Sequence, residues 1–252
     1  MFRWGLYSLR NLWARRVTTA LTVVGLGLVV FVLLAVLMLA HGLEQTLGKT
    51  GDPENVIILR KGALSEIGSS LSREEIRAVA AQPDVRLTAD GRPLAVAEVG
   101  LQLTLRKGQG GSLTSVTLRG TAPEALAVRP AIRLIQGRLW KPGTTEIVVG
   151  ASIARQFPDA RVDRVLHFGN WAWTVVGVFE AGGSGFDSEV WGDAEQFLAT
   201  FHRTTFSSMT LRLAQPATLP AFKDRIERDP RFKFSVKREP EYYEGKAEGL
   251  AR

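Results

Sequence analysis

The sequence predicts an α+β protein in which one membrane-spanning helix precedes an exported domain made of β-α-β units with an inserted β-rich subdomain. Two observations lead to this prediction. An uncharged apolar run covers residues 17–40, and a chain of different composition follows it. In that chain, residues 55–105 and 207–238 each show strand, helix and strand patterns in succession, which is the order of a β-α-β unit. We take residues 46–240 as the exported domain.

The apolar run is long enough to cross a bilayer. A helix rises about 1.5 Å per residue, so residues 17–40 exceed the roughly 30 Å of a hydrocarbon core. A cleaved signal peptide is the alternative, but its apolar region spans about 7 to 15 residues and ends at a small-x-small site. This run is longer and ends with Met38, Leu39, Ala40 and His41. We therefore expect an uncleaved anchor.

The charges on either side of the run predict its orientation. The leader, residues 1–16, contains four arginines and no acidic residue, whereas the first basic residue after the run is Lys49. By the positive-inside rule, the N-terminus is cytoplasmic and the residues after about 45 lie on the opposite side. Apolar side chains in the leader also recur at helical spacing, at Phe2, Leu6, Leu9 and Trp13. We expect a helix in the cytoplasmic interface, which either only flanks the anchor or also contacts a cytoplasmic partner.

Composition argues against several functions. The formal net charge is +7, and the leader supplies four of these charges, which leaves the exported part near +3. The basic excess therefore faces membrane lipid, and no nucleic-acid partner is expected. The chain has no cysteine, which excludes disulfides and thiolate metal sites.

The first β-α-β unit begins with a β-rich run at Asn55–Leu59. Ser72 and Glu75 then form a capping-box pattern at the start of a helix. Residues 85–105 follow as extended segments with a break near 89–93.

The second unit repeats this order. Ser208–Leu213 alternates like a strand, Thr218–Arg228 carries a helical apolar stripe, and Phe232–Val236 alternates again. Two such units separated by an insertion suggest a ferredoxin-like split β-α-β sandwich.

The insertion, residues 115–200, has the patterns of an all-β subdomain. A two-residue turn, Gly169-Asn170, separates two strand-like runs and predicts a hairpin. Trp171 and Trp173 fall on one face of its second strand, where they would form either the sheet core or a platform for a stacked ligand. The strand-like runs are Ser115–Arg119, Thr145–Val149, Val162–Phe168 and Trp171–Phe179.

Two glycine-containing segments come close to catalytic motifs. Residues 42–50 resemble a phosphate-binding loop, but five residues separate Gly42 from Gly48 where the motif has four, and no strand precedes them. Gly182–Phe186 lacks the final glycine of a nucleophile elbow, and we interpret it as a flexible loop. Neither segment predicts an enzyme.

The titratable residues show no pattern of a catalytic or metal site. The acidic pair Glu74–Glu75 marks a helix start, and Asp187 with Glu189 belongs to a loop predicted over Glu180–Trp191. We therefore nominate no catalytic, cofactor-binding or metal-ligating residue. Three histidines share no ligand spacing, namely His41, His167 and His202.

Several segments, in the same order, resemble one protein family. RNLWARRVTTALTVVGLGLVV is similar to the opening of the FtsX-like permeases of the MacB type, in which a basic helix runs into a threonine-rich first span. In the exported part, LRGTAPEALAVRPAIRLIQGRLW, TTEIVVGASIARQF and WTVVGVFEAGGSGFDSEVWGDAEQF are similar to the periplasmic core domain of that family. The resemblance covers most of residues 1–240.

The resemblance implies the permease subunit of a type VII ABC transporter in the bacterial inner membrane. In such permeases the periplasmic domain contains a porter-like part and an inserted β-rich part. They relay ATPase-driven motion through the membrane for export or extraction of an envelope substrate. The implied partners are a cytoplasmic ABC ATPase subunit that binds Mg-ATP, a second permease protomer in a homo- or heterodimer, a periplasmic adaptor as a further candidate, and membrane lipid.

Family members continue with further spans, and we expect residues 241–252 to lead toward a second span. The alternative function is a single-pass anchored module that binds a periplasmic partner without transport activity. An anchored hydrolase is weaker still, because no nucleophile and base are seen together. We expect this chain to hold no cofactor and to be no enzyme, with ATP hydrolysis in the partner subunit.

Overall fold

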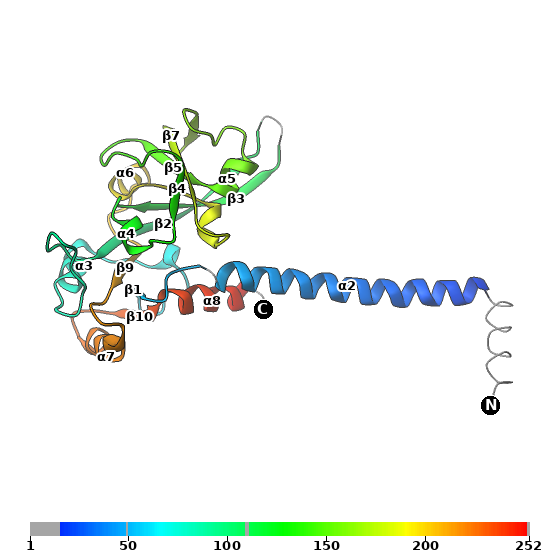
Figure 1. Cartoon of the computed structure of the whole chain (residues 1–252), viewed down its shortest axis with the longest axis horizontal. Coiled ribbons are helices and arrows are strands. Elements are labelled where there is room, and N and C mark those ends of the chain that lie inside the picture. Colours follow the sequence, from blue (N-terminus) through cyan, green and yellow to red (C-terminus); the bar gives the residue numbers. More distant parts are fainter. Residues whose placement is uncertain (1–15, 49, 109–110, 251–252) are drawn as a thin grey trace. The chain divides into compact units, whose positions relative to one another are not determined.

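The computed structural model describes residues 16–48, 50–108 and 111–250. The chain divides into two units, Met1–Gln45 and Thr46–Arg252 (Figure 1). The predicted amphipathic leader, residues 1–16, lies outside the described residues apart from Arg16.

Helix α2 (Arg16–Gly48) makes up the described part of the first unit. Its last three residues, Thr46–Gly48, are counted with the second unit. Within it, Thr19–Leu39 is long and apolar enough to cross a membrane, with a mean hydropathy of 2.9. Large apolar side chains are exposed all around this stretch, as in a helix that faces lipid instead of a protein core. The residues that resemble a phosphate-binding loop, Gly42–Gly48, continue the helix, so they form no such loop.

In its described residues, the second unit is built from ten strands and the helices between them (Figure 1). The elements are, in chain order, β1 (Asn55–Arg60), η1 (Glu66–Gly68), α3 (Arg73–Ala80), β2 (Ala95–Arg106), β3 (Leu113–Thr121), α4 (Ala125–Val128), β4 (Arg133–Gly137), β5 (Glu146–Gly150), α5 (Ala151–Gln156), β6 (Val165–Phe168), β7 (Trp171–Glu180), η2 (Gly185–Ser188), β8 (Glu189–Asp193), α6 (Ala194–Thr200), β9 (Ser208–Arg212), η3 (Pro216–Thr218), α7 (Leu219–Arg228), β10 (Phe234–Arg238) and α8 (Glu239–Leu250).

The first sheet has the strand order of a ferredoxin-like fold. Its order is β10-β1-β9-β2, and every neighbouring pair is antiparallel. One unit is β1-α3-β2 and the other is β9-α7-β10, so the strands of the two units interleave. Both helices bury an apolar stripe in one core, where Val79 of α3 and Phe222 of α7 join Ile58 of β1. The predicted split β-α-β sandwich is confirmed.

The predicted capping box at α3 is also confirmed. The hydroxyl of Ser72 accepts a hydrogen bond from the Glu75 N–H at 3.2 Å, and the Glu75 carboxylate accepts one from the Ser72 N–H at 2.7 Å. These bonds satisfy N–H groups that the first turn of a helix leaves unpaired. Glu75 also forms an ion pair with Arg60 at 2.7 Å, which ties the helix start to β1.

The insertion forms a second sheet in the order β3-β8-β5-β7-β4, with β6 paired to β7. Strand β2 belongs to both sheets, because Ala95–Glu98 pairs with β9 whereas Val99–Arg106 pairs with β3. A core between the sheets contains Ile57 of β1 together with Phe179 and Trp191 of the second sheet. The predicted β-rich insertion is therefore joined to the first sheet by a continuous strand and by a shared core.

The loop predicted over Glu180–Trp191 is wrong in its second half. Strand β8 begins at Glu189, lies between β3 and β5, and has all five residues buried. Two carboxylates and a glycine interrupt its apolar pattern, so the sequence does not look like a strand. Strand β4 was also absent from the prediction, because most of its side chains are exposed and show no alternation.

The predicted β6–β7 hairpin is confirmed. Phe168 pairs with Trp171 across Gly169-Asn170, and both turn residues have positive φ, 58° and 61°, as the tight hairpin turn requires. Trp173 is fully buried and stacks on Phe168 with ring centroids 5.1 Å apart. Trp171 is 51% exposed, so only one of the two tryptophans predicted on this face belongs to the core.

We expect Trp173→Ala to lower the free energy of unfolding by about 3–5 kcal/mol, because it leaves a cavity against Phe168 and Phe197. Trp171→Ala, two residues away in the same strand, is the matched control and should change it by about 0.5 kcal/mol or less. Urea unfolding of the full chain in detergent, followed by circular dichroism, measures both. Equal losses would contradict the placement of Trp173 alone in the core.

Candidate functional site

Six charged side chains are buried together between the two sheets. They come from η1, β2, β3, β8, the segment after α4 and the first residue of α8. None of them is more than 7% exposed. We call this group the arginine–glutamate cluster, which consists of Arg119, Arg129, Glu66, Glu98, Glu189 and Glu239.

Arg119 of β3 binds three of the glutamates. Its Nε and Nη2 donate to the two carboxylate oxygens of Glu189 at 2.8 and 2.9 Å, which is a bidentate contact. Its Nη1 donates to Glu66 at 2.7 Å and to Glu98 at 3.2 Å. Arg119 thus holds η1, β2 and β8 together.

Arg129, which follows α4, binds the cluster through Glu98 and Glu239. Its two Nη atoms donate to the two oxygens of Glu98 at 2.7 and 2.8 Å. Its Nε donates to Glu239 at 2.7 Å, and its Nη2 also donates to the hydroxyl of Thr210 in β9 at 3.0 Å. Glu98 is therefore shared by both arginines, on the strand that belongs to both sheets.

Glu239 connects the two ends of the second unit. It is the first residue of α8, and its carboxylate accepts hydrogen bonds from the Asp52 N–H at 2.9 Å and from Asn55 Nδ2 at 2.8 Å. Gly51 has a φ of 94° and packs so closely that a Cβ there would lie 2.7 Å from Cγ of Glu239. The segment just after α2 is thus fastened to the start of α8 and, through Arg129, to the whole cluster.

The cluster holds four carboxylates and two guanidinium groups, which gives a formal charge of −2. Burial alone would raise the pKa of Glu98, but the charges of Arg129 and Arg119 outweigh it and lower that pKa to about 2. Burial opposes ionisation of Glu66 as well, and Arg119 again outweighs it and lowers the pKa. Neutral donors complete the cluster, namely Thr121, Ser208, Thr210 and Nε1 of Trp191.

Aromatic side chains cover the arginines. The ring of Phe186 in η2 lies 5.3 and 5.0 Å from the two guanidinium carbons. The Tyr243 hydroxyl accepts a hydrogen bond from Arg119 at 3.2 Å, and the Tyr242 hydroxyl accepts one from the Glu66 N–H at 3.0 Å. Burial raises the pKa of both tyrosines, so α8 contacts the cluster through neutral hydroxyl groups.

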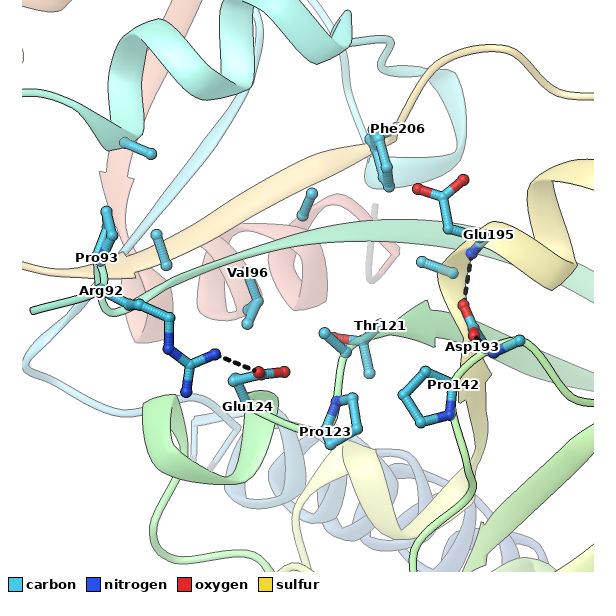
Figure 2. Close-up of a pocket in the computed structure, with 16 residues that line it drawn as sticks. Arg92, Pro93, Val96, Thr121, Pro123, Glu124, Pro142, Asp193, Glu195 and Phe206 are labelled. Carbon is cyan, nitrogen blue, oxygen red and sulfur yellow. Dashed lines mark hydrogen bonds and ion pairs between the residues drawn. The ribbon is translucent and has the colours of Figure 1, made fainter. Parts of the chain in front are cut away.

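A groove of about 710 Å³ is the second candidate site (Figure 2). It lies between α3 and β2 on one side and the ends of β3 and β8 on the other. Two exposed ion pairs join these sides: Arg92–Glu124 at 3.0 Å and Arg73–Glu195 at 2.6 Å. Its volume is in the range of ligand-binding clefts.

Asp187 and Glu189, which were predicted to lie in one loop, belong to different elements. Asp187 lies in η2 and Glu189 in β8. Asp187 accepts hydrogen bonds from the N–H groups of Ala181 and Gly183, both at 2.7 Å, and so closes a turn. Glu189 is instead a strand residue bound to Arg119.

The three histidines lie in or next to three different elements. His41 is in α2, His167 is in β6, and His202 follows α6. Among the described residues, no group of three histidine or acidic side chains could hold a metal ion. The cluster itself was not predicted from the sequence, because its members carry no local motif.

We expect Arg119→Met to lower the free energy of unfolding by about 3–5 kcal/mol, because it leaves Glu66 and Glu189 buried without their counter-charge. Arg138→Met is the matched control, since it removes a solvent-exposed pair with Glu146 and should have little effect. Urea unfolding of the full chain compares the two variants. Similar effects would contradict a special role for burial.

Acid should destabilise the second unit through Glu98. Its folded pKa is about 2 against a usual 4.5, so the unfolded chain takes up a proton first. The resulting stability is fully present above about pH 5 and is lost as the pH falls toward about 2. We expect the urea midpoint to fall across this window, and more steeply in the wild type than in Glu98→Gln. A constant wild-type midpoint there would contradict a charged Glu98.

Comparison with known proteins agrees with this architecture. No curated protein sequence matches the chain. Among solved structures, the extracellular domain of the noncanonic ABC-type transporter YknZ from Gram-positive bacteria is similar with a TM-score of 0.56 and 14% identity, over 73% of this chain and 99% of that one. The periplasmic region of MacB from Actinobacillus actinomycetemcomitans is similar with a TM-score of 0.56 and 14% identity, over 74% of this chain and 89% of that one.

At this identity the two likenesses show the fold. The family assignment comes from the profile of the MacB-like periplasmic core domain, which matches residues 19–229 and so begins within the apolar helix. The resemblance seen in the sequence is confirmed. The chain belongs to the MacB-like periplasmic core domain family.

Proposed function

We propose that this chain is the membrane-anchored N-terminal part of a MacB/FtsX-type ABC transporter permease. It relays motion driven by a partner ATPase to its exported domain, for export or extraction of an envelope substrate. ATP and Mg²⁺ bind to the partner subunit, and this chain performs no chemistry of its own. Family membership and the ABC-type neighbours support the transporter class.

The observation that carries the proposal is the position of Glu239. Its carboxylate binds the segment that directly follows α2, and it also binds Arg129, which binds Glu98. Removing one partner from a buried ion pair costs about 3–5 kcal/mol, so these groups resist separation. A displacement that enters along the chain from α2 therefore reaches both sheets through one stiff set of contacts.

The surroundings of the cluster differ in stiffness from the groove. The pairs Arg92–Glu124 and Arg73–Glu195 are exposed to solvent, where ion pairs contribute little and re-form easily. The two sheets are thus held firmly at the cluster and weakly at the groove. We infer that movement of one sheet against the other opens or narrows the groove.

The proposed topology follows the charge asymmetry. The N-terminus is cytoplasmic, α2 spans the inner membrane, and residues after about 45 are periplasmic. The proposed assembly contains a second permease protomer and a cytoplasmic ABC ATPase, with membrane lipid around α2 and a periplasmic adaptor as a further candidate partner.

The alternative is a single-pass anchored module that binds an envelope partner without transport activity. The groove favours it, because a cleft of that volume can bind a ligand whether or not an ATPase is present. The two functions differ in one requirement, which is nucleotide-dependent association with an ATPase.

We expect an ABC ATPase to be crosslinked to this protein in its native membrane, and more strongly with Mg-ATP and vanadate than with ADP. Because the sequence has no cysteine, spin labels can be placed at Leu64→Cys and Leu113→Cys, both at exposed positions. The distance between the two spin labels, measured by double electron–electron resonance, should differ between the Mg-ATP and ADP states.

Glu239→Gln tests the relay, since it weakens the contact with Arg129 without touching the cytoplasmic side. It should leave ATPase crosslinking intact and reduce the nucleotide-dependent change in distance. Glu146→Gln, in an exposed pair, is the control and should leave both unchanged. The absence of any ATPase crosslink would reject coupling and favour the anchored binding module.

A further inference from the structure

Strand β2 has an open edge inside the groove. Residues Ala95–Glu98 pair with β9 on one side, but pairing with β3 on the other side starts only at Val99, opposite Gly120. Antiparallel pairing directs the backbone groups of successive residues to alternate sides. Leu94 and Glu98 accept hydrogen bonds from the β9 side, so the N–H and C=O of Ala97 and the C=O of Ala95 point the other way.

The groove surrounds this edge. Ala95 and Ala97 lie on the face of β2 that packs toward α3, whereas Val96 lies on the opposite face, in the core between the sheets. All three residues line the groove. A cavity lined from both faces of a strand must run along the strand's edge.

The far wall forms where β3 leaves its partner. The register would place Ala122 opposite Ala97, but β3 ends at Thr121 and the chain turns away through Pro123 (Figure 2). No hydrogen bond joins Ala97 to Ala122 in this described part of the chain. Small side chains complete the walls and leave space beside the backbone, among them Ala80, Pro93, Pro142 and Gly143.

The rim of the groove carries carboxylates in exposed ion pairs. Three carboxylates line it, those of Glu124, Asp193 and Glu195, and Glu124 pairs with Arg92 whereas Glu195 pairs with Arg73. Asp193 is used internally, since it accepts from the N–H groups of Gly143 and Glu195. Glu124 and Glu195 are about half exposed, with side-chain exposures of 46% and 54%. Figure 2 shows Glu124 beside Arg92, and Glu195 on the other side of the cleft near Asp193 and Phe206.

We propose that the groove binds an extended polypeptide segment of a partner protein that carries a basic side chain. The segment adds to the open edge of β2 and forms main-chain hydrogen bonds with Ala95 and Ala97. Its basic side chain takes the place of Arg92 at Glu124 or of Arg73 at Glu195, because these exposed pairs are weak and re-form easily. Strand addition of this kind obtains affinity from the backbone and selectivity from the flanking side chains. The proposal does not depend on coupling to an ATPase.

The test uses the full chain in detergent and a fluorescent, capped heptapeptide of alternating threonine and valine with one central lysine. We expect saturable binding below 1 mM, measured as anisotropy, and slower hydrogen exchange of the amides in residues 96–99. N-methylation of the peptide's central amides should weaken binding about tenfold or more, because the strand bonds are lost. Replacing its lysine with glutamate should weaken binding several-fold.

Two variants locate the site. Ala122→Phe fills the groove and should abolish binding, whereas Ala214→Phe, at an exposed position outside it, is the control and should bind normally. Thermal unfolding checks that both are folded. No binding at 1 mM, or equal binding of the N-methylated peptide, would overturn the proposal. The latter outcome would assign the groove to a small apolar molecule instead.

Discussion

A buried guanidinium group needs counter-charges within the fold, because moving its charge out of water without a partner costs several kcal/mol. The structure meets this requirement around Glu98, which binds Arg119 from one side and Arg129 from the other. Glu98 lies at the point where β2 passes from the first sheet to the second. The sheets can therefore be joined in only one register if both arginines are to be paired. Buried ion pairs are poor evidence for added stability, but this set fixes which arrangement of the sheets is allowed.

The distribution of polar contacts gives the domain a stiff centre and a compliant edge. At the centre, Phe186 covers both guanidinium groups, and the charged side chains are buried. At the edge, the pairs between the sheets are open to solvent and weakly held. The groove lies at this edge, beside the part of β2 that has lost β3 as a neighbour. A change in the angle between the sheets would thus act first on the width of the groove, with the cluster as the fixed point.

Local patterns in the sequence predicted the elements with short-range signals. The Ser72 and Glu75 capping box and the Gly169-Asn170 hairpin depend on residues three or two positions apart, and both were found. The two interleaved β-α-β units followed from periodicity. Strand β8 and the cluster could not be found this way, because the buried charge of Glu189 is paired with Arg119, 70 residues away in the chain, and no local pattern shows this. A charge on the inward side of a predicted strand, as at Arg119, was the available signal.

The first segment of the second unit and the start of α8 meet at one side chain. Glu239 begins α8, and its carboxylate holds the backbone of Asp52 while Gly51 presses against its methylene groups. This packing leaves no room for a side chain at Gly51, so the two segments cannot slide past each other without losing the hydrogen bonds. A pull on either segment is therefore shared with the other and, through Arg129, with Glu98. The two segments therefore act on the sheets as one.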